Sequence, residues 1–205
     1  PQPEKKDPLG LFILRTYAPT THQYGFHFQE YESGMYTPII REGIRSARTR
    51  KGRHYTVYLP AFSDQRIVSV LSQVKGIQWQ VFSKHNSSAF THENVHVRPI
   101  NHAAFLDSIS GCQGVLCAAG FETPSEALYL GKKLCVIPMK NQLEQQCNAL
   151  ALAKMGVVVL DSFNLDTAPA LQQWVLSDHR VSVDYGDIAG EVVDRVLEEH
   201  ALVIV

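Results

Sequence analysis

The sequence predicts an α/β fold in which one parallel β-sheet carries helices on both of its faces. From about residue 54 onward, short runs rich in β-branched and aromatic residues alternate with segments of helical period. This alternation is typical of βα units on a parallel sheet. With 205 residues and 45% hydrophobic content, the chain can also bury one sizeable core. We therefore expect a Rossmann-like sheet of about six strands.

Each expected strand is a short apolar or alternating run. The six runs are HYTVYLP (54–60), IQWQVF (77–82), NVHVR (94–98), GVLCA (114–118), KLCVIP (133–138) and GVVVL (156–160). Helices are expected to begin near Ser63, Asn101, Thr123 and Asn141, with two more at 168–176 and 187–200. The sequence contains no internal repeat and no low-complexity tract.

The first 53 residues follow a different pattern, which places a boundary near residue 53. FILRTYAP (12–19) and YGFHFQEY (24–31) suggest strands, and six Lys or Arg residues then fall between Arg41 and Arg53. A basic run of this kind is most often a solvated linker or helix face. Nucleic-acid binding is the weaker interpretation, because no pattern of aromatic residues for base stacking accompanies the run.

The net charge and the cysteine content indicate which kinds of partner and which cellular compartment to expect. A formal net charge of -1 and a pI near 6.9 give no global attraction to nucleic acid or anionic membranes. The four cysteines match no zinc or redox spacing, so free thiols and a cytoplasmic location are expected. No apolar run reaches the roughly 18 to 20 residues of a transmembrane segment. Because the sequence does not begin with Met, we expect a fragment of a longer protein.

Three familiar catalytic patterns are rejected. HENVH (92–96) has the letters of a zinc peptidase motif, but its second histidine lies in an alternating strand instead of a helix, so no metal site is expected. No G-x-S-x-G nucleophile elbow occurs. The first expected strand ends in Pro60-Ala61-Phe62-Ser63 and not in a glycine-rich phosphate loop.

The stretch AAGFETPSEA (118–127) carries the main candidate site. After strand 114–118 the backbone turns at Gly120, and Thr123 to Glu126 match a capping box with proline at the first helical position. Glu126 could act only as part of that cap. Alternatively, the free amides of residues 121–123 face the carboxyl edge of the sheet, where a diphosphate fits, and Glu126 one turn later can accept from a ribose diol.

The next βα unit repeats this arrangement. After strand 133–138, Asn141 and Glu144 form a second possible cap, and amide side chains follow at the start of the helix. Two consecutive units with acids and amides at one sheet edge favour a site for a polyhydroxylated ligand over two coincidental caps.

Residues 112–157 resemble the nucleotide-sugar-binding half of GT-B glycosyltransferases, in particular the UDP-glycosyltransferases and the bacterial peptidoglycan N-acetylglucosaminyltransferase. The matching run is AGFETPSEALYLGKKLCVIPMKNQLEQQCNALALAKMGV. The resemblance implies donor-binding roles: Gly120, Phe121 and Thr123 at the diphosphate, Glu126 at the ribose, Glu144 and Gln145 at the sugar, and Ile100 and Asn101 near the base. Ala118 departs from the pattern, because many relatives carry a His or Arg there that touches phosphate.

The same resemblance implies one half of a GT-B fold. Residues 54–205 would be the nucleotide-sugar donor domain, and residues 1–53 would be the remnant of an N-terminal acceptor half with its linker. The donor is expected to be UDP-linked and to need no cofactor or obligatory metal. The catalytic base normally comes from the absent half, so no catalytic residue is assigned; His22 and His27 are the only candidates in the remnant. Two alternatives are a sugar-nucleotide epimerase and a non-catalytic module that binds nucleotide-sugar or docks a partner through residues 41–53.

Overall fold

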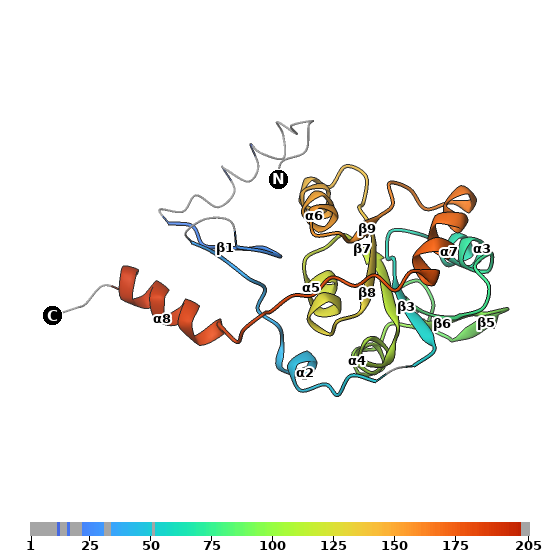
Figure 1. The fold of residues 1–205 in the computed structure, drawn as a ribbon, viewed down its shortest axis with the longest axis horizontal. Coiled ribbons are helices and arrows are strands. Elements are labelled where there is room, and N and C mark those ends of the chain that lie inside the picture. Colours follow the sequence, from blue (N-terminus) through green and yellow to red (C-terminus); the bar gives the residue numbers. More distant parts are fainter. Residues whose placement is uncertain (1–11, 13–15, 17–21, 31–33, 51, 202–205) are drawn as a thin grey trace.

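The computed structural model describes residues 12, 16, 22–30, 34–50 and 52–201, and they contain the expected α/β layers (Figure 1). The main sheet has seven strands in the order β5-β6-β4-β3-β7-β8-β9, and all neighbours are parallel except β5 and β6. The strands are β3 (His54–Tyr58), β4 (Gln78–Ser83), β5 (Phe90–His92), β6 (Val95–Pro99), β7 (Gly114–Ala118), β8 (Lys133–Ile137) and β9 (Val158–Val159). The prediction of a parallel sheet is confirmed.

The strand order identifies the topology. Counted along the chain, the six parallel strands lie in the spatial order 3-2-1-4-5-6, which is the doubly wound order of Rossmann folds. In this order the sheet reverses its direction of growth between β3 and β7. Ligands of such sheets bind outside the carboxyl ends of the strands at that point.

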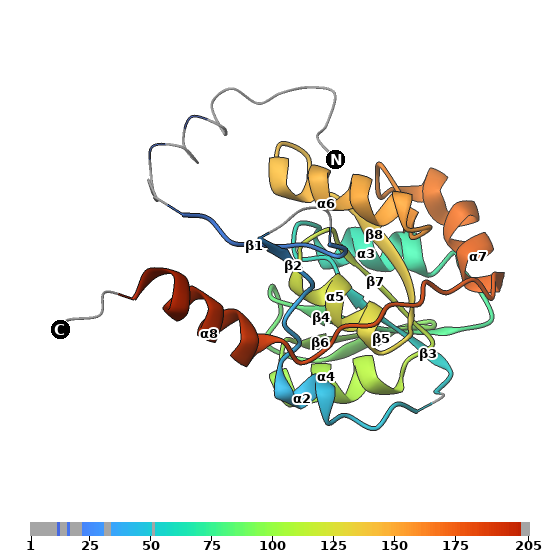
Figure 2. The same cartoon turned by 60° about the vertical axis from the view of Figure 1, so that its left-hand side comes forward.

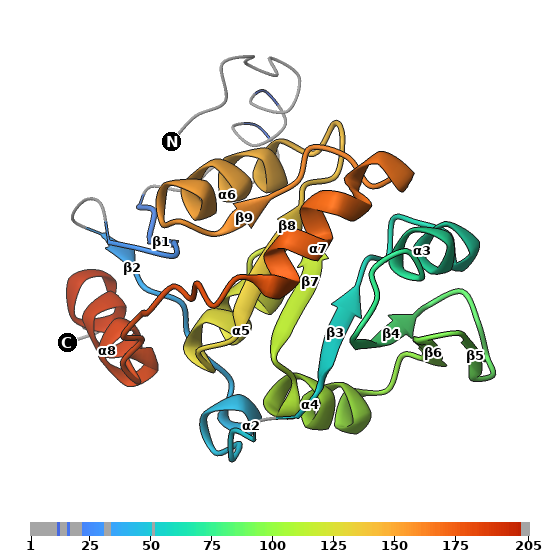
Figure 3. The ribbon, with the colours of Figure 1, turned by 45° about the vertical axis from the view of Figure 1, so that its right-hand side comes forward.

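Helices cover both faces of the sheet, as Figures 2 and 3 show from two sides. On one face pack α3 (Asp64–Leu71) and α7 (Ala168–Leu176), the latter preceded by a 3-10 turn at Leu165–Thr167. On the other face pack α2 (Glu42–Arg45), α4 (His102–Gly111), α5 (Glu122–Tyr129) and α6 (Leu143–Lys154). Expected helix bounds at 168–176 are confirmed, and α8 (Ala189–His200) begins two residues later than predicted.

The two-residue period of the strands produces two separate cores. In β7, Val115 and Cys117 face the α4–α5–α6 layer, whereas Leu116 faces the α3–α7 layer. The α3–α7 side also contains a buried aromatic cluster in which the Trp174 ring lies 5.1 Å from Tyr55 and 6.5 Å from Trp79. Because burial of a large apolar side chain contributes about 1.5 to 3 kcal/mol, these rings hold α7 firmly on the sheet.

The segment before β3 packs against the same sheet. Phe28, Ile40 and Ile44 are buried in the core under α4, α5 and α6. The expected strand at 24–31 is reduced to β1 (Gly25–Phe26), which pairs in parallel with β2 (Met35–Tyr36), and α8 lies beside this pair (Figure 1). The expected strand at 12–19 falls almost entirely outside the described residues.

Two further expectations meet the structure here. All four cysteines are free, and Cys112, Cys117 and Cys135 are buried. HENVH is not helical, as predicted, but it forms a hairpin and not one strand: β5 ends at His92, Glu93 turns with φ 49°, and His96 lies in β6. Over the described residues, no cluster of three or more His, Cys, Asp or Glu could hold a metal, and every helix is too short or too polar to cross a membrane.

Candidate functional site at the carboxyl edge of the sheet

The turn between β7 and α5 lies where the strand order reverses. Strand β7 ends at Ala118, and α5 begins at Glu122 with Phe121 as its N-cap. A side chain built at Gly120 would meet nothing within 4 Å, so this turn leaves its backbone open to an approaching ligand. The first amides of α5 have no partner within the helix and face this edge, which favours an anionic or polar ligand.

The predicted capping box at Thr123 is wrong, because α5 starts before Thr123. Phe121 already has helical dihedrals, and no side chain makes a capping hydrogen bond. The Phe121 ring packs 5.1 Å from Phe28, and both the amide and the hydroxyl of Ser125 donate to the Phe121 carbonyl. Pro124 therefore falls in the first turn, where its missing N–H costs nothing. Thr123 is inside the helix and cannot serve as the cap.

Glu126 is held by a residue of the linker and not by the helix start. Its Oε1 lies 2.6 Å from Arg41 Nε, and its Oε2 accepts a 3.1 Å hydrogen bond from Arg41 Nη2. The Glu126 side chain is 3% exposed, whereas Arg41 is 32% exposed. The cap role for Glu126 is thus excluded, and its carboxylate is a buried group whose partner comes from 85 residues away.

A pocket of about 320 Å³ opens beside this ion pair. It is lined by Arg41, Tyr58, Ile100, His102, Phe105, Glu122, Thr123 and Glu126. The structure thus brings together three predicted site residues, Ile100, Thr123 and Glu126. Phe121 lines a smaller adjacent cavity of about 90 Å³, which also reaches Glu126. Asn101 is not in the lining; its side chain caps α4, which begins where the sequence predicted a helix, by accepting from the Ala104 amide at 2.9 Å.

The charges in the pocket are mixed. Two carboxylates, Glu122 and Glu126, share it with the Arg41 guanidinium, which also contacts His102 Nε2. Burial raises the pKa of Glu126; Arg41 lowers it, and Glu122 raises it further. Burial is the largest of these influences, so the pKa of this carboxyl is raised although Arg41 opposes the shift. Arg41, Glu122, His102 and Tyr58 were missed from the sequence, because nothing local marks a linker arginine or a strand-end tyrosine as part of this site.

The second predicted cap, Asn141 with Glu144, is also wrong. Helix α6 begins at Leu143 with Gln142 as N-cap and no side-chain cap, because Asn141 takes a left-handed φ of 64°. An N-cap residue normally has extended dihedrals, whereas asparagine tolerates the left-handed region. Asn141 therefore turns the chain and leaves the helix start uncapped.

Side chains of α6 organise the neighbouring loops. Buried Gln145 accepts from the Met139 amide at 3.0 Å, and buried Asn148 donates to the Ala119 carbonyl at 3.1 Å. Asn148 therefore fixes the turn that leads into α5. Glu144 is exposed, and neither Glu144 nor Gln145 lines the pocket beside Glu126.

A second cavity of about 280 Å³ lies at the same edge, where β3, β8 and β9 end. Its lining includes two cationic side chains, Arg66 and Lys140, and one acid, Asp161. The histidines considered as base candidates lie elsewhere: His22 stacks on His200 of α8, and His27 packs on Phe28. Neither lines the pocket at Glu126.

Comparison with known proteins identifies the class. A family model described as "Glycosyl transferase family 1" matches residues 14–176, which is most of the chain. The chain therefore belongs to the glycosyl transferase family 1, and its fold is that of a GT-B half. No protein of curated function matches the sequence significantly.

Solved structures support the same fold. Phytolacca americana UGT2, solved with UDP-2fluoro-glucose and pterostilbene, matches with a TM-score of 0.51 and 14% identity over 84% of this chain and 49% of its own. Arabidopsis thaliana UGT89C1, solved with quercetin, matches with a TM-score of 0.51 and 14% identity over 71% of this chain and 42% of its own. The glycotransferase of kitacinnamycin matches with a TM-score of 0.50 and 14% identity over 80% of this chain and 50% of its own. The chain thus spans about half the length of these proteins, and the likeness concerns the fold.

Proposed function

We propose that this chain is the donor-binding half of a glycosyltransferase that transfers a sugar from a nucleotide diphosphate-sugar to an acceptor. The observation that carries the proposal is the buried Glu126 carboxylate, placed one turn into α5 and beside a pocket at the reversal point of the sheet. A carboxylate in this position suits the two hydroxyls of a ribose, while the free amides at the start of α5 suit the diphosphate.

The remaining assignments follow the same logic. Gly120, Phe121 and Thr123 would lie along the diphosphate, Ile100 and Tyr58 would contact the base or ribose, and Glu144 would contact the sugar. Glu122 counts against tight phosphate binding at the helix start, because its own carboxylate lies in the same pocket. The guanidinium of Arg41 offsets the negative charge of Glu122. It would also supply the positive group that many relatives carry at the position of Ala118.

The nucleotide is proposed to be UDP, since the UGT2 of similar fold was solved with UDP-2fluoro-glucose. The reaction is further proposed to need no cofactor and no obligatory metal. We also propose that transfer requires an acceptor half, with residues 1–53 contributing its remnant and the linker. Free buried thiols at Cys112, Cys117 and Cys135 support a reducing, cytoplasmic location.

A thermal-shift screen of UDP, GDP, TDP and their sugars tests the proposal. A ligand at one hundred times its Kd stabilises the fold by about 2.7 kcal/mol, which is easily measured as a higher melting temperature. We expect a response to UDP and a UDP-sugar. If no nucleotide shifts the melting temperature at millimolar concentration, the donor-binding proposal is wrong.

A further inference from the structure

A separate pocket of about 590 Å³ lies at the opposite edge of the sheet from Glu126. Its lining includes the residues directly before β3, β7 and β8, so it sits at the amino ends of these strands. The residues that line it are Thr49, Arg50, Gly52, Arg53, Cys112, Gln113, Leu130, Gly131, Lys132 and Arg180. Four of them are cations, and none carries a carboxylate.

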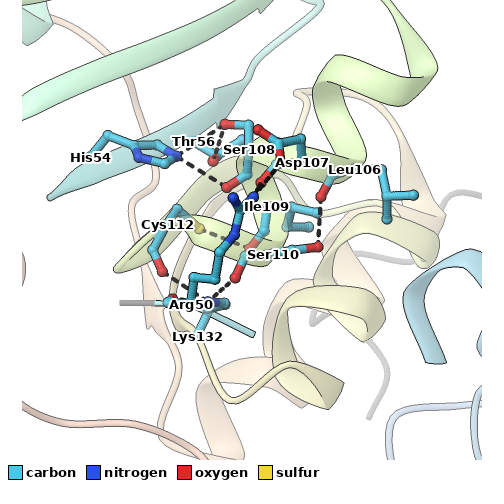
Figure 4. A network of polar contacts seen from close by, with 10 residues as sticks. All are labelled: Arg50, His54, Thr56, Leu106, Asp107, Ser108, Ile109, Ser110, Cys112 and Lys132. Atoms are coloured by element: carbon cyan, nitrogen blue, oxygen red, sulfur yellow. Dashed lines mark hydrogen bonds and ion pairs between the residues drawn. The ribbon is translucent and has the colours of Figure 1, made fainter. Parts of the chain in front are cut away.

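Two of the cations are partly explained by the fold. Lys132 is buried, and its Nζ donates to the carbonyls of Ser110 at 2.6 Å, Cys112 at 2.9 Å and Arg50 at 3.3 Å (Figure 4). Arg180 Nη1 donates to the carbonyls of Gln113 and Gly131, both at 3.2 Å. Most of these carbonyls lie at or just beyond the ends of α4 and α5, where helix dipoles favour positive charge.

The other two cations, Arg50 and Arg53, are not needed to neutralise the helix ends. Arg50 pairs with the exposed Asp107. Arg53 is exposed and makes no hydrogen bond or ion pair with any residue that the structure describes. One carboxylate and the partial charges of two helix ends, roughly half a charge each, leave about two positive charges uncompensated among the four cations.

Lys132 shows the effect of this excess. Burial lowers the pKa of its ammonium group, and the charges of Arg180 and Arg50 lower it further. A positive charge held in a desolvated position beside other positive charges is stabilised by a bound anion. Arg50, Arg53 and Arg180 also present planar guanidinium groups, which match the oxygens of phosphate in two-point contacts.

We propose that this pocket binds a small multivalent oxyanion of the phosphate class, independently of the donor site. The cations come from two separate parts of the chain besides Lys132: Arg50 and Arg53 belong to the linker before β3, and Arg180 follows α7. A bound anion would therefore fasten the linker to the rest of the sheet's amino edge.

Isothermal titration with inorganic diphosphate at low salt tests the proposal. Arg53→Ala is the main variant, because Arg53 has no partner in the described structure and its loss should leave the melting temperature unchanged. Arg66→Ala is the matched control: it removes one exposed positive charge at the carboxyl edge. We expect Arg53→Ala to weaken binding about fivefold, as for a screened ion pair of about 1 kcal/mol, and Arg66→Ala to leave it unchanged.

Two further results bear on the proposal. Arg53→Glu should abolish binding, and added salt should weaken binding to the wild-type chain, because the attraction is electrostatic. Absence of diphosphate binding to the wild-type chain would overturn the proposal. A loss with Arg66→Ala in place of Arg53→Ala would assign the anion to the carboxyl edge and equally overturn it.

Discussion

Arg41 of the linker grips the buried carboxylate of Glu126 at two points, with one nitrogen 2.6 Å from Oε1 and another 3.1 Å from Oε2. The group proposed to take the ribose diol is therefore already paired with a residue that precedes the sheet. If nucleotide binds at Glu126 as proposed, its binding is coupled to the position of the linker, and substitutions of the two residues should separate their contributions.

Glu126→Gln should weaken nucleotide binding at least tenfold, because hydrogen bonds to a charged group contribute about 1.5 to 3 kcal/mol, which a neutral amide does not supply fully. The same change removes the ion pair with Arg41, so the melting temperature should fall by a few degrees. Calorimetric titration with UDP and a thermal melt measure the two effects. Unchanged nucleotide affinity together with the lower melting temperature would restrict Glu126 to a structural role.

Arg41→Ala should destabilise the chain more at neutral than at acid pH. Burial already raises the pKa of Glu126 above its ordinary value of 4.5, and loss of Arg41 removes the main opposing influence. A raised acid pKa stabilises the fold below the unfolded value, and this stabilisation is lost as pH rises through the folded value. Thermal melts of wild-type and variant from about pH 4.5 upward should diverge. In the double variant Arg41→Ala, Glu126→Gln, the divergence should vanish.

Asn148→Ala should weaken nucleotide binding indirectly, because Asn148 positions the turn before α5 and is not proposed to contact the ligand. The substitution leaves the buried Ala119 carbonyl unpaired, which costs about 1 to 3 kcal/mol, and it frees the turn that leads into α5. Asn94→Ala is the matched control, because Asn94 donates to the Val74 and Ile77 carbonyls far along the chain from this turn. Both variants should lose stability, but only Asn148→Ala should lose affinity for UDP. Equal affinities in the two variants would contradict the positioning role.

Glu144→Ala should distinguish sugar contacts from nucleotide contacts. Glu144 is exposed and lies outside the pocket at Glu126, so its removal should not change the melting temperature. If its carboxylate accepts from the sugar hydroxyls, the affinity for UDP-glucose should fall several-fold, whereas the affinity for UDP should stay constant. A parallel fall in both affinities, or in neither, would argue against this assignment.

The chain alone should bind nucleotide but transfer sugar negligibly. Transfer needs a base and an acceptor held within about 3 to 3.5 Å of the reacting atoms, and we expect the acceptor half to supply both. Nucleotide release from a bound donor, measured with a broad panel of acceptors, checks this. Turnover near the usual range of about 1 to 1000 per second would place the base within this chain. Glu122 and His102, which line the pocket, would then be the residues to replace first.

Sequence reasoning succeeded where the signal was local. Helices α3 and α4 begin after Ser63 and Asn101, whose side chains accept from amides three residues later, as their cap chemistry predicts. The apolar runs likewise predicted every parallel strand of the main sheet. β5 was missed because all three of its residues are exposed, so no buried face marks it as a strand.

The failures come from contacts between distant segments. The start of α5 depends on Phe121 packing against Phe28, which no local pattern encodes. The pairing of Arg41 with Glu126 spans 85 residues, so nothing in the basic run at 41–53 indicated that its first arginine would pair with a buried carboxylate. The site was therefore predictable as a position in the βα pattern, but its charge balance was not.

The two outermost strands of the sheet also influence how copies of the chain behave at high concentration. At one margin β5 has three residues, and at the other β9 has two. A long, flat edge strand has unpaired backbone groups that can hydrogen-bond to a strand of a second molecule and start aggregation. Strands as short as β5 and β9 present very few such groups. The short edge strands of this sheet thus limit edge-to-edge pairing between copies of the chain.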